Sequence, residues 1–259
     1  MNQRPHILIT NDDGVKAPGL AALAEALSQV GRVTVLAPQR NWSIAGQAKT
    51  LYKPLRVEET TLANGMPALA TNGKPSDAVA LALLGLVERP IDLLVSGINS
   101  GPNLGHDVTY SGTVTAAMEG AIGGLPAIAL SLQVEEGHHY ETAAAFAVRI
   151  AQLVLRHGLP AETLLNVNVP DLPAEAVRGV QITRCGRRIY RDELVRRLDP
   201  QGRPYYWIGG LPPTGIAEEG TDIGAVAQGY ISVTPLQLDL TAHALLGDLR
   251  TWDWEGWPS

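Results

Sequence analysis

The sequence predicts an α/β fold with a doubly wound, mostly parallel sheet, followed by a C-terminal antiparallel β-hairpin extension. In the first two-thirds of the chain, short apolar segments alternate with segments of helical spacing, and repeated units of this kind form parallel sheets. After about Pro170, strand-like segments are separated by Pro- and Gly-rich turns with no helix between them. This pattern predicts an antiparallel extension instead of more of the same sheet. We expect a core at residues 1–170 and a β-rich extension with a C-terminal tail at 171–259.

Local signals justify each element in turn. Residues 19–30 contain three leucines spaced three and four apart, which lie on one face of a helix. Pro75 is typical of a helix entry, and Ser111 is a good N-cap after the glycine-rich loop at 97–110. The expected helices are 19–30, 76–87, 111–122, about Tyr140–His157 and roughly 242–249. The expected strands are 7–10, 32–37, 54–58, 68–71, 91–96, 127–132 and 164–169 in the core, then 180–184, 205–208 and 229–234.

Composition restricts the classes of function. The net charge of −6 disfavours binding to a nucleic-acid polymer or to an anionic membrane surface. The single cysteine, Cys185, excludes an intramolecular disulfide and is typical of a reducing compartment. Strand-like residues begin by His6, which leaves no room for a signal peptide, and no apolar run is long enough to span a membrane. We therefore expect a cytoplasmic protein.

Two adjacent carboxylates, Asp12 and Asp13, directly follow the first expected strand, and Gly14 comes after them. Two anions a few ångströms apart repel by about 4 kcal/mol at an effective dielectric constant near 20, so such a pair favours a bound cation. The carboxyl edge of an α/β sheet is also where ligands bind. An Asn-Asp-Gly run is equally common in polar turns, and these residues alone leave that alternative open.

A second polar cluster follows the strand expected at 91–96. The segment 96–105 (SGINSGPNLG) contains glycines, which let backbone N–H groups approach an anion, and asparagines, whose amide oxygens are neutral metal ligands. Ser111 then begins a helix, and a helix N-terminus offers unpaired N–H groups to a phosphate. The loop after the second strand adds Asn41 and Ser43 to this edge. A surface loop and an ordinary cap explain each signal separately, but their convergence indicates a hard divalent cation that faces a phosphate.

The chain resembles the SurE (survival protein E) family in six segments that occur in order along nearly its whole length. The matching segments are 8–14 (LITNDDG), 37–46 (APQRNWSIAG), 72–78 (NGKPSDA), 96–120 (SGINSGPNLGHDVTYSGTVTAAMEG), 166–170 (NVNVP) and 219–240 (EGTDIGAVAQGYISVTPLQLDL). The resemblance implies a Rossmann-like sheet and metal-dependent hydrolysis of nucleoside 5′-monophosphates. Some members of the family also cleave 3′-nucleotides or short polyphosphate. The resemblance further implies a homodimer or homotetramer whose C-terminal hairpins exchange between subunits.

The site residues also come from this resemblance. The implied metal ligands are Asp12, Asp13, Ser43 and Asn99, and the implied phosphate contacts are Asn103, Ser111, Gly112 and Thr113. A ligand set made only of oxygens suits Mg²⁺ or Mn²⁺, one ion per subunit, and argues against zinc. One of the two aspartates would act catalytically by accepting a proton from water, and the sequence leaves open which one.

Other readings of the same residues exist. Ser111 is a candidate nucleophile, but no motif places a histidine or lysine base near it. A phospho-accepting receiver domain would need an aspartate at the end of a central strand, where this chain has Ser-Gly-Ile-Asn at 96–99, and it would be about half this size. A non-catalytic nucleotide-binding sensor on the same fold is the main alternative, because binding and turnover would use the same groups.

Three further clusters are candidates for binding. His138 and His139 are adjacent at a helix start, where an exposed pair is expected to face in different directions instead of sharing a metal. An arginine-rich stretch is expected to form the solvated face of a hairpin, or alternatively to attract additional phosphates. It comprises Arg184, Arg187, Arg188, Arg191, Arg196 and Arg197. Aromatic residues offer either stacking on a nucleobase or packing at an interface. They are Tyr205, Tyr206 and Trp207, with Trp252, Trp254 and Trp257 near the end of the chain.

Overall fold

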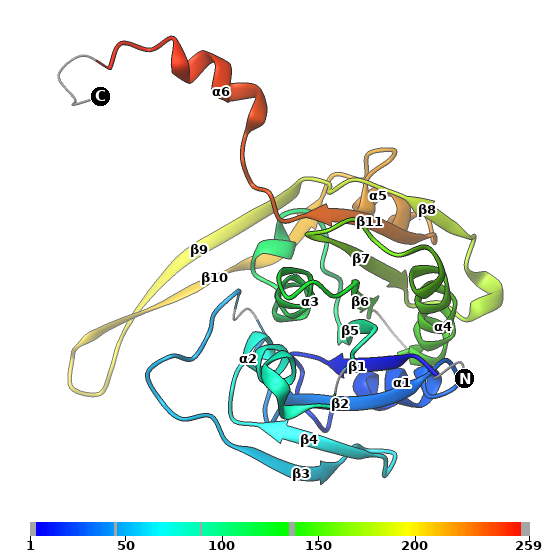
Figure 1. The fold of residues 1–259 in the computed structure, drawn as a ribbon. Coiled ribbons are helices and arrows are strands. Elements are labelled where there is room, and N and C mark those ends of the chain that lie inside the picture. The colour runs from blue at the N-terminus through cyan, green and yellow to red at the C-terminus, as the bar shows by residue number, and fades with distance from the viewer. Residues whose placement is uncertain (1–3, 44–45, 89, 135–137, 255–259) are drawn as a thin grey trace.

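The computed structural model describes residues 4–43, 46–88, 90–134 and 138–254. Its centre is a nine-stranded sheet in the order β3-β4-β2-β1-β5-β6-β7-β11-β8, and a separate two-stranded ribbon pairs β9 with β10 (Figure 1). The strands from β2 to β7 in this order, passing through β1, β5 and β6, are parallel neighbours. The predicted doubly wound α/β sheet with a C-terminal antiparallel hairpin is therefore confirmed.

The elements have the following bounds. The strands are β1 (His6–Thr10), β2 (Arg32–Pro38), β3 (Val57–Thr61), β4 (Pro67–Thr71), β5 (Leu93–Ser100), β6 (Ala127–Gln133), β7 (Thr163–Pro170), β8 (Val180–Ile182), β9 (Arg188–Leu198), β10 (Pro204–Gly215) and β11 (Ile231–Gln237). The α-helices are α1 (Pro18–Leu27), α2 (Pro75–Leu81), α3 (Gly112–Ile122), α4 (Tyr140–His157), α5 (Asp222–Ala227) and α6 (His243–Arg250). Short helical turns occupy η1 (Ala82–Leu86), η2 (Gly105–Thr109) and η3 (Ala174–Ala176).

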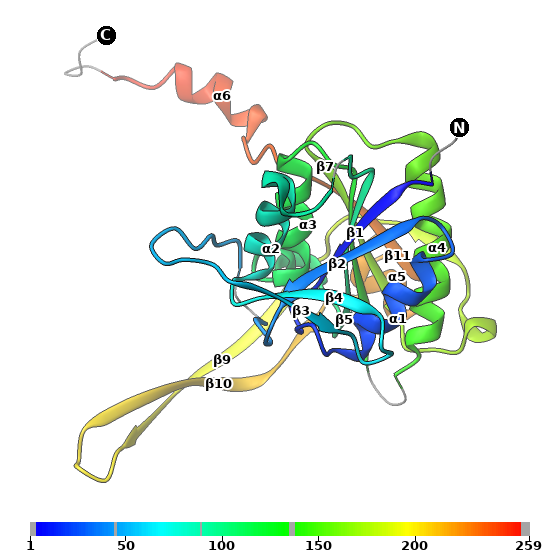
Figure 2. The same cartoon turned by 60° about the horizontal axis from the view of Figure 1, so that its bottom comes forward.

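Helices cover both faces of the sheet, and each face has its own apolar core. Helices α1 and α4 pack together on one face, and α2 and α3 pack together on the other (Figure 2). Strand β1 serves both cores, because Ile7 and Ile9 join the cluster beneath α1 and α4, while Leu8 joins the cluster beneath α2 and α3. All three side chains are fully buried, and each contributes about 1.5–3 kcal/mol to folding. Burial on both faces fixes the position of the end of β1, and Asp12 lies two residues after that end.

The first part of the chain follows the predicted order of elements, with shifts at some boundaries. Strand β5 continues to Ser100, past the expected end at residue 96, and its register with β6 shifts between Ser96 and Asn99. The helix expected at 76–87 becomes the π-helical turn η1 after Leu81, where Gly85 has a positive φ. The strand expected at 54–58 lies at Val57–Thr61.

Two expectations about the chain after Pro170 are wrong. Strand β11 pairs antiparallel with β7, and β8 pairs parallel with β11, so both continue the main sheet instead of leaving it. The second error concerns helices, because α5 lies between β10 and β11. Pairing of β11 with β7 satisfies backbone N–H and C=O groups that the edge of the sheet would otherwise expose. Because the two strands are far apart in the chain, no local sequence pattern predicts this pairing.

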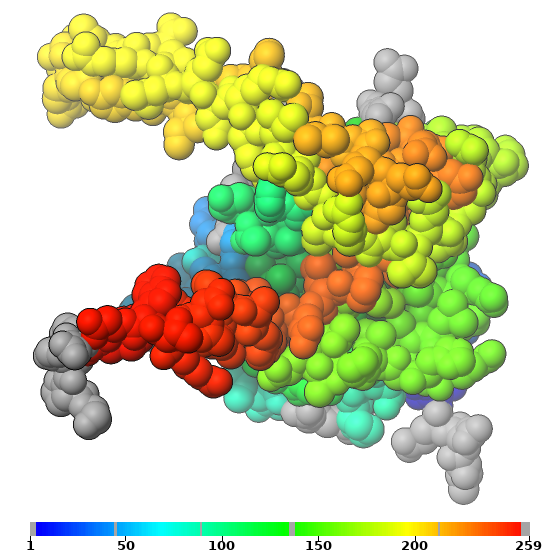
Figure 3. Space-filling model, turned by 90° about the horizontal axis from the view of Figure 1, so that it is seen from above, coloured from blue at the N-terminus to red at the C-terminus, as the bar shows by residue number. Residues whose placement is uncertain are grey.

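The ribbon β9–β10 and helix α6 project from the same side of the body (Figure 3). In the described chain β9 and β10 form ladder pairs only with each other, and α6 has no buried residue. Several large apolar side chains on the ribbon are exposed, including Trp207 and Ile208. Among the described residues, no helix combines the length and the apolar character needed to cross a bilayer.

Candidate active site

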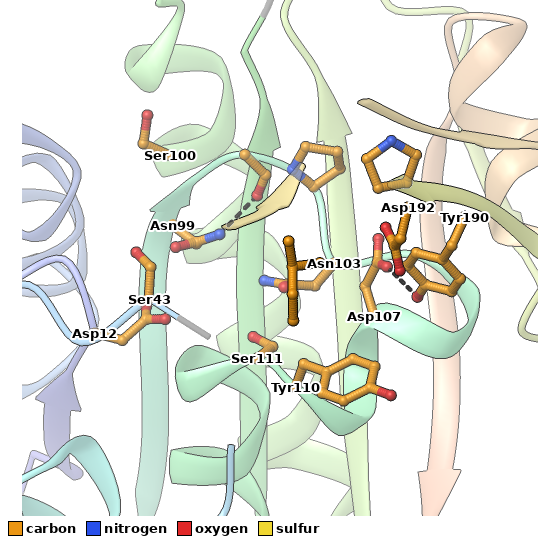
Figure 4. Close-up of a pocket in the computed structure, with 14 residues that line it drawn as sticks. Asp12, Ser43, Asn99, Ser100, Asn103, Asp107, Tyr110, Ser111, Tyr190 and Asp192 are labelled. Atoms are coloured by element: carbon orange, nitrogen blue, oxygen red, sulfur yellow. Dashed lines mark hydrogen bonds between the residues drawn. The ribbon is translucent and has the colours of Figure 1, made fainter. Parts of the chain in front are cut away.

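A cavity of about 680 Å³ opens at the carboxyl edge of the sheet, between the ends of β1 and β5, the start of α3 and the base of the ribbon (Figure 4). Its lining includes Asp12, Ser43, Asn99, Asn103 and Ser111 from the sheet side, and Asp107, Tyr110, Tyr190 and Asp192 from the ribbon side and the adjoining loop. Figure 4 shows Asp12, Ser43 and Asn99 grouped at one end, and Tyr190 and Asp192 at the other. The cavity therefore has two chemically different ends.

Asp12 is held at the bottom of the sheet-side end. Its side chain is only 3% exposed, and Oδ1 accepts a hydrogen bond from the Thr113 hydroxyl. Burial raises the pKa of Asp12 above its ordinary value, while hydrogen bonds from Thr113 and from the start of α3 act in the opposite direction. Gly112 allows this contact, because a Cβ there would lie 2.6 Å from the Cβ of Asp12. The close approach of α3 to β1 thus depends on the absence of a side chain at residue 112.

Asp13 is anchored by its neighbours but remains partly accessible. Its Oδ2 accepts a hydrogen bond from the backbone N–H of Ser100 at 3.0 Å, and its Oδ1 accepts a bond from the Asn41 amide at 3.4 Å. Burial, together with the nearby charge of Asp12, raises the pKa of Asp13 to about 6. Among the described residues, no lysine, arginine or histidine forms an ion pair with Asp12 or Asp13. Asp12 is therefore buried and Asp13 partly buried, and neither carboxylate has a compensating cation among the described residues.

Ser43 and Asn99 add neutral oxygens at the same end of the cavity. The backbone N–H and the hydroxyl of Ser43 both donate to Asn41 Oδ1 at 2.6 Å. The Asn99 amide nitrogen donates to the Gly101 carbonyl at 2.7 Å, and Figure 4 shows the amide oxygen directed towards Ser43 and Asp12. The four expected metal ligands are thus brought to one region, where carboxylate, hydroxyl and amide oxygens make a donor set suited to a hard divalent cation.

Only two of the four expected phosphate contacts, Asn103 and Ser111, line the cavity. Ser111 caps α3 by accepting from the Val114 N–H at 3.1 Å, and it lines the cavity together with Asn103. Asn103 is rigidly held, because its amide donates to Ser131 and its backbone N–H donates to Asn168, each at 2.8 Å. The hydroxyl of Thr113 points instead to Asp12, and Gly112 and Thr113 do not line the cavity.

The base of the ribbon is held by two carboxylates, Asp107 in η2 and Asp222 in α5, that sequence reasoning did not single out. Asp107 accepts hydrogen bonds from Arg188 Nε at 2.6 Å and from the Tyr190 hydroxyl at 2.7 Å. Asp222 is fully buried and accepts from the backbone N–H groups of Gly105 and Gly186, both at 2.7 Å. These two carboxylates fasten the base of the ribbon to the loop that carries the phosphate-side residues. Asp107 and Asp222 both lie inside segments that carry the family resemblance, and this resemblance is the sequence signal that could have identified them.

The remaining candidate clusters lie outside the cavity lining. The His139 ring contacts Asp171 Oδ1 at 2.9 Å, so the structure does not bring His138 and His139 together as a metal pair. Tyr205, Tyr206 and Trp207 are exposed on β10. Trp252 and Trp254 stack on each other, and Trp257 lies outside the described residues. Of the arginines, Arg188 pairs with Asp107 and Arg184 pairs with Glu218.

A metal fits the donor set at the sheet-side end of the cavity. The fit rests on one buried carboxylate, Asp12, and one partly buried carboxylate, Asp13, whose pKa values are raised and whose charges no described side chain neutralises. The described residues contain no group of three or more His, Cys, Asp or Glu residues that could hold a metal, so a zinc-like site is not found there. The fold and the site together define an α/β protein with an oxygen-lined ligand cavity at the carboxyl edge of its sheet.

Comparison with known proteins places the chain in a family. Residues 7–192 match the model of the family described as Survival protein SurE. The chain is 55% identical over 252 residues to the 5′-nucleotidase SurE of Chloroflexus aggregans, covering 96% of this chain and 100% of that protein. It is 54% identical over 251 residues to the 5′-nucleotidase SurE of Herpetosiphon aurantiacus, covering 96% and 98%. The crystal structure of the SurE protein from Aquifex aeolicus is similar with a TM-score of 0.82 and 43% identity, covering 95% and 98%. The chain belongs to the SurE family, as its sequence motifs predicted.

Proposed function

We propose that this protein is a metal-dependent 5′-nucleotidase, which hydrolyses nucleoside 5′-monophosphates to a nucleoside and inorganic phosphate. Its family membership and the names of its relatives support the reaction class. The observation that carries the proposal is the pair formed by buried Asp12 and partly buried Asp13, which has no cationic partner among the described residues. Asp12 lines one end of a cavity large enough for a nucleotide. The alternative, a non-catalytic sensor, is not favoured, because the similar curated proteins are named as nucleotidases.

In this proposal one Mg²⁺ or Mn²⁺ per subunit is held by Asp12, Asp13, Ser43 and Asn99. When bound, such an ion lowers the pKa of a coordinated water and polarises a phosphoryl oxygen. The chain's own contribution is positional. The Ser100 N–H and the Thr113 hydroxyl orient the two carboxylates, so that one of them can accept the proton of the attacking water.

The phosphoryl group is held by neutral donors beside the metal ligands. Ser111 and Asn103 line the cavity, and the Ser131 hydroxyl, which can donate or accept, supports the Asn103 amide. Gly112 and Thr113 begin α3 next to Ser111, so the positive end of the helix dipole favours an anion at this edge, although their own donors contact Asp12. With these groups fixed before substrate binds, little reorganisation is needed in the transition state.

Phosphate release from AMP tests this function. The reaction is measured in excess chelator and again after addition of Mn²⁺ or Mg²⁺. We expect no release in chelator and restoration by either ion. Full activity in excess chelator would contradict the metal requirement. A metal-loaded protein that binds nucleoside monophosphates but releases no phosphate would instead support the sensor. A panel with 3′-nucleotides and tripolyphosphate extends the same assay to the other family substrates.

The assembly we propose is a homodimer or homotetramer held together by the C-terminal segments. The ribbon exposes Trp207, Ile208 and Leu211, and α6 exposes Leu245 and Leu246. Apolar patches on projecting elements are typical of interaction surfaces. Multi-angle light scattering at micromolar concentration is expected to give two or four chains, and deletion of the ribbon tip is expected to lower the mass. A stable monomer would refute this assembly. We also propose a cytoplasmic location, which the presence of a single cysteine supports.

A further inference from the structure

Strand β7 places two asparagines, Asn166 and Asn168, inside the molecule next to the loop that carries Asn103. Both side chains are fully buried. They alternate with Val167 and Val169, which join the core beneath α1 and α4, so the two asparagines lie on the opposite face of the sheet, which α3 covers. A buried amide destabilises a fold unless it is hydrogen-bonded. Both of these amides find their partner in Asn103.

The backbone of Asn103 is held by these two side chains. Its N–H donates to Asn168 Oδ1 at 2.8 Å, and its carbonyl accepts from Asn168 Nδ2 at 3.0 Å. The same carbonyl accepts a second bond from Asn166 Nδ2 at 2.8 Å. Residues 102–104 belong to no helix or strand, so the two side chains supply the hydrogen bonds that regular structure would otherwise provide. Because the planar amide of Asn168 engages both the N–H and the carbonyl of Asn103, it restricts the position and the rotation of the backbone at that residue.

The side chain of Asn103 is fixed by a separate contact. Its Nδ2 donates to the hydroxyl of Ser131 at 2.8 Å, and Ser131 is fully buried on β6, the strand that pairs with β7. A primary amide carries two N–H donors, so the bond to Ser131 uses one and leaves the second for a phosphoryl oxygen. Asn103 thus presents a donor to the cavity from a backbone and a side chain that are both held by the sheet.

Asn166 shows that the useful group is its N–H donor. Among the described residues, Oδ1 of Asn166 is buried and has no hydrogen-bond partner, which destabilises the fold. An aliphatic side chain would fill the same place without that cost. The benefit of an asparagine at this position therefore lies in the bond that its Nδ2 donates to the carbonyl of Asn103.

We propose that Asn168 and Asn166 are positioning residues, which hold Asn103 where its amide meets the phosphoryl group. The inference rests on the proposed function, and it extends the phosphate site to a strand that does not line the cavity. A misplacement of about 1 Å can lower a reaction rate by about a hundredfold. Anchoring to β7 gives a donor on an irregular loop the rigidity of a buried strand.

The test measures the binding of inorganic phosphate in excess Mg²⁺ by isothermal titration calorimetry, together with kcat/KM for AMP. Asn168→Ala is expected to weaken phosphate binding and to lower kcat/KM, each by about tenfold. The metal concentration that gives half-maximal rate should stay within about twofold of the wild type, because the printed bonds of Asn168 reach only Asn103. Asn166→Ala removes one of two donors to the same carbonyl and should have a smaller effect, about threefold.

A double-mutant cycle with Asn103→Ala separates positioning from a general loss of structure. In Asn103→Ala the amide to be positioned is gone, so adding Asn168→Ala should change phosphate binding by less than about twofold. Ser232→Ala is the matched control. Ser232 is fully buried beside Asn168 on the neighbouring strand β11, and its hydroxyl contacts Thr183. This control should leave phosphate binding unchanged.

The outcomes distinguish the positioning role from the proposed function. Wild-type phosphate binding and kcat/KM in both Asn168→Ala and Asn166→Ala would overturn the positioning role, and the nucleotidase function would stand. A tenfold loss that persists in the Asn103→Ala background, or that appears in Ser232→Ala, would also overturn it. A wild type that releases no phosphate from AMP would overturn the proposed function, and phosphate binding would still decide the positioning role. Because Asn166→Ala also removes the unpaired Oδ1, it is expected to fold even if Asn168→Ala does not, and the same cycle then applies to it.

Discussion

The two ends of the cavity differ in how they are built. The sheet-side end is formed by strand ends and the start of α3, and its residues rest on a sheet buried between two layers of helices. The ribbon-side end is formed by β9 and β10, which leave that sheet and are fastened to it through Asp107 and Asp222. We therefore assign the hydrolysis, which requires fixed geometry, to the sheet-side end, which is the rigid end of the cavity. We assign selection of the substrate to the ribbon-side end, because a substitution in the ribbon can alter that end without changing the sheet-side end.

Removal of a charge from the rigid end is expected to have the largest effect on turnover. Asp12→Asn preserves the shape of the side chain but removes one of the two charges proposed to hold the metal. We expect turnover of AMP and of ribose 5-phosphate to fall together by at least about a hundredfold, because both share the metal step. The measurement is phosphate release at saturating Mn²⁺. Asp192→Asn removes a charge from the other end and should leave kcat for ribose 5-phosphate close to that of the wild type, with any effect confined to KM.

The connection between the two ends is tested at Asp222. Its carboxylate accepts three backbone N–H bonds, from Gly105, Gly186 and Ile223, and it is fully buried. Asp222→Asn replaces one acceptor oxygen by a donor that faces an N–H group. We expect a loss of about 3 kcal/mol in the free energy of unfolding, measured by chemical denaturation. Glu193→Gln, an exposed change on the ribbon, should leave this free energy unchanged. An Asp222→Asn protein as stable as the wild type would show that the ribbon is not fastened in this way.

Within the rigid end, metal binding and phosphate binding should separate. Ser111→Ala and Asn103→Ala should each lower kcat/KM by about ten- to a hundredfold and weaken inhibition by phosphate, with the metal dependence nearly unchanged. Ser43→Ala and Asn99→Ala should instead raise the metal concentration that gives half-maximal rate. If all four variants shift metal dependence equally, this division is wrong. Trapping of a phosphorylated Ser111 in the wild type would assign that residue a nucleophilic role.

A smaller effect concerns pH and the metal-free protein. The pKa of Asp13 is about 6 in the folded chain and near 3.9 in an unfolded one, so folding favours the neutral carboxyl. Ionised Asp13 therefore destabilises the fold, and this cost grows as pH rises from about 4 to 6 and is constant above. Asp13→Asn should be more stable than the wild type in chelator, with a larger difference in melting temperature at pH 7.5 than at pH 5. An equal or reversed difference would contradict the raised pKa.

The sequence predicted the rigid end better than the ribbon end for a physical reason. Asp12 lies two residues after strand β1, and Asn99 is the penultimate residue of strand β5. The apolar pattern of these strands and the cap at Ser111 are local signals. The strand expected at 91–96 proved longer, because pairing with β6 resumes after a register shift that only the neighbouring strand determines.

The contacts of the ribbon end join residues far apart in the chain and leave no periodic trace. Tyr190 meets Asp107 across 83 positions, and Asp222 meets Gly105 across 117. The aromatic residues that looked suitable for stacking on a base, Tyr205 to Trp207, lie on exposed strand β10 and not in the cavity lining. At the proposed ligands, the family resemblance identified more residues than the local sequence pattern did. Their roles as metal and phosphate contacts stay predictions.

Binding of Mn²⁺ to the purified protein, measured by isothermal titration calorimetry without substrate, tests the two-ended cavity most directly. The wild type and Asp192→Asn are expected to bind one ion per chain with similar affinity, whereas Asp12→Asn is expected to lose that binding by at least about a hundredfold in Kd. A wild type that binds no ion, or an Asp192→Asn protein that loses binding as completely as Asp12→Asn does, would contradict the assignment of the metal to the sheet side.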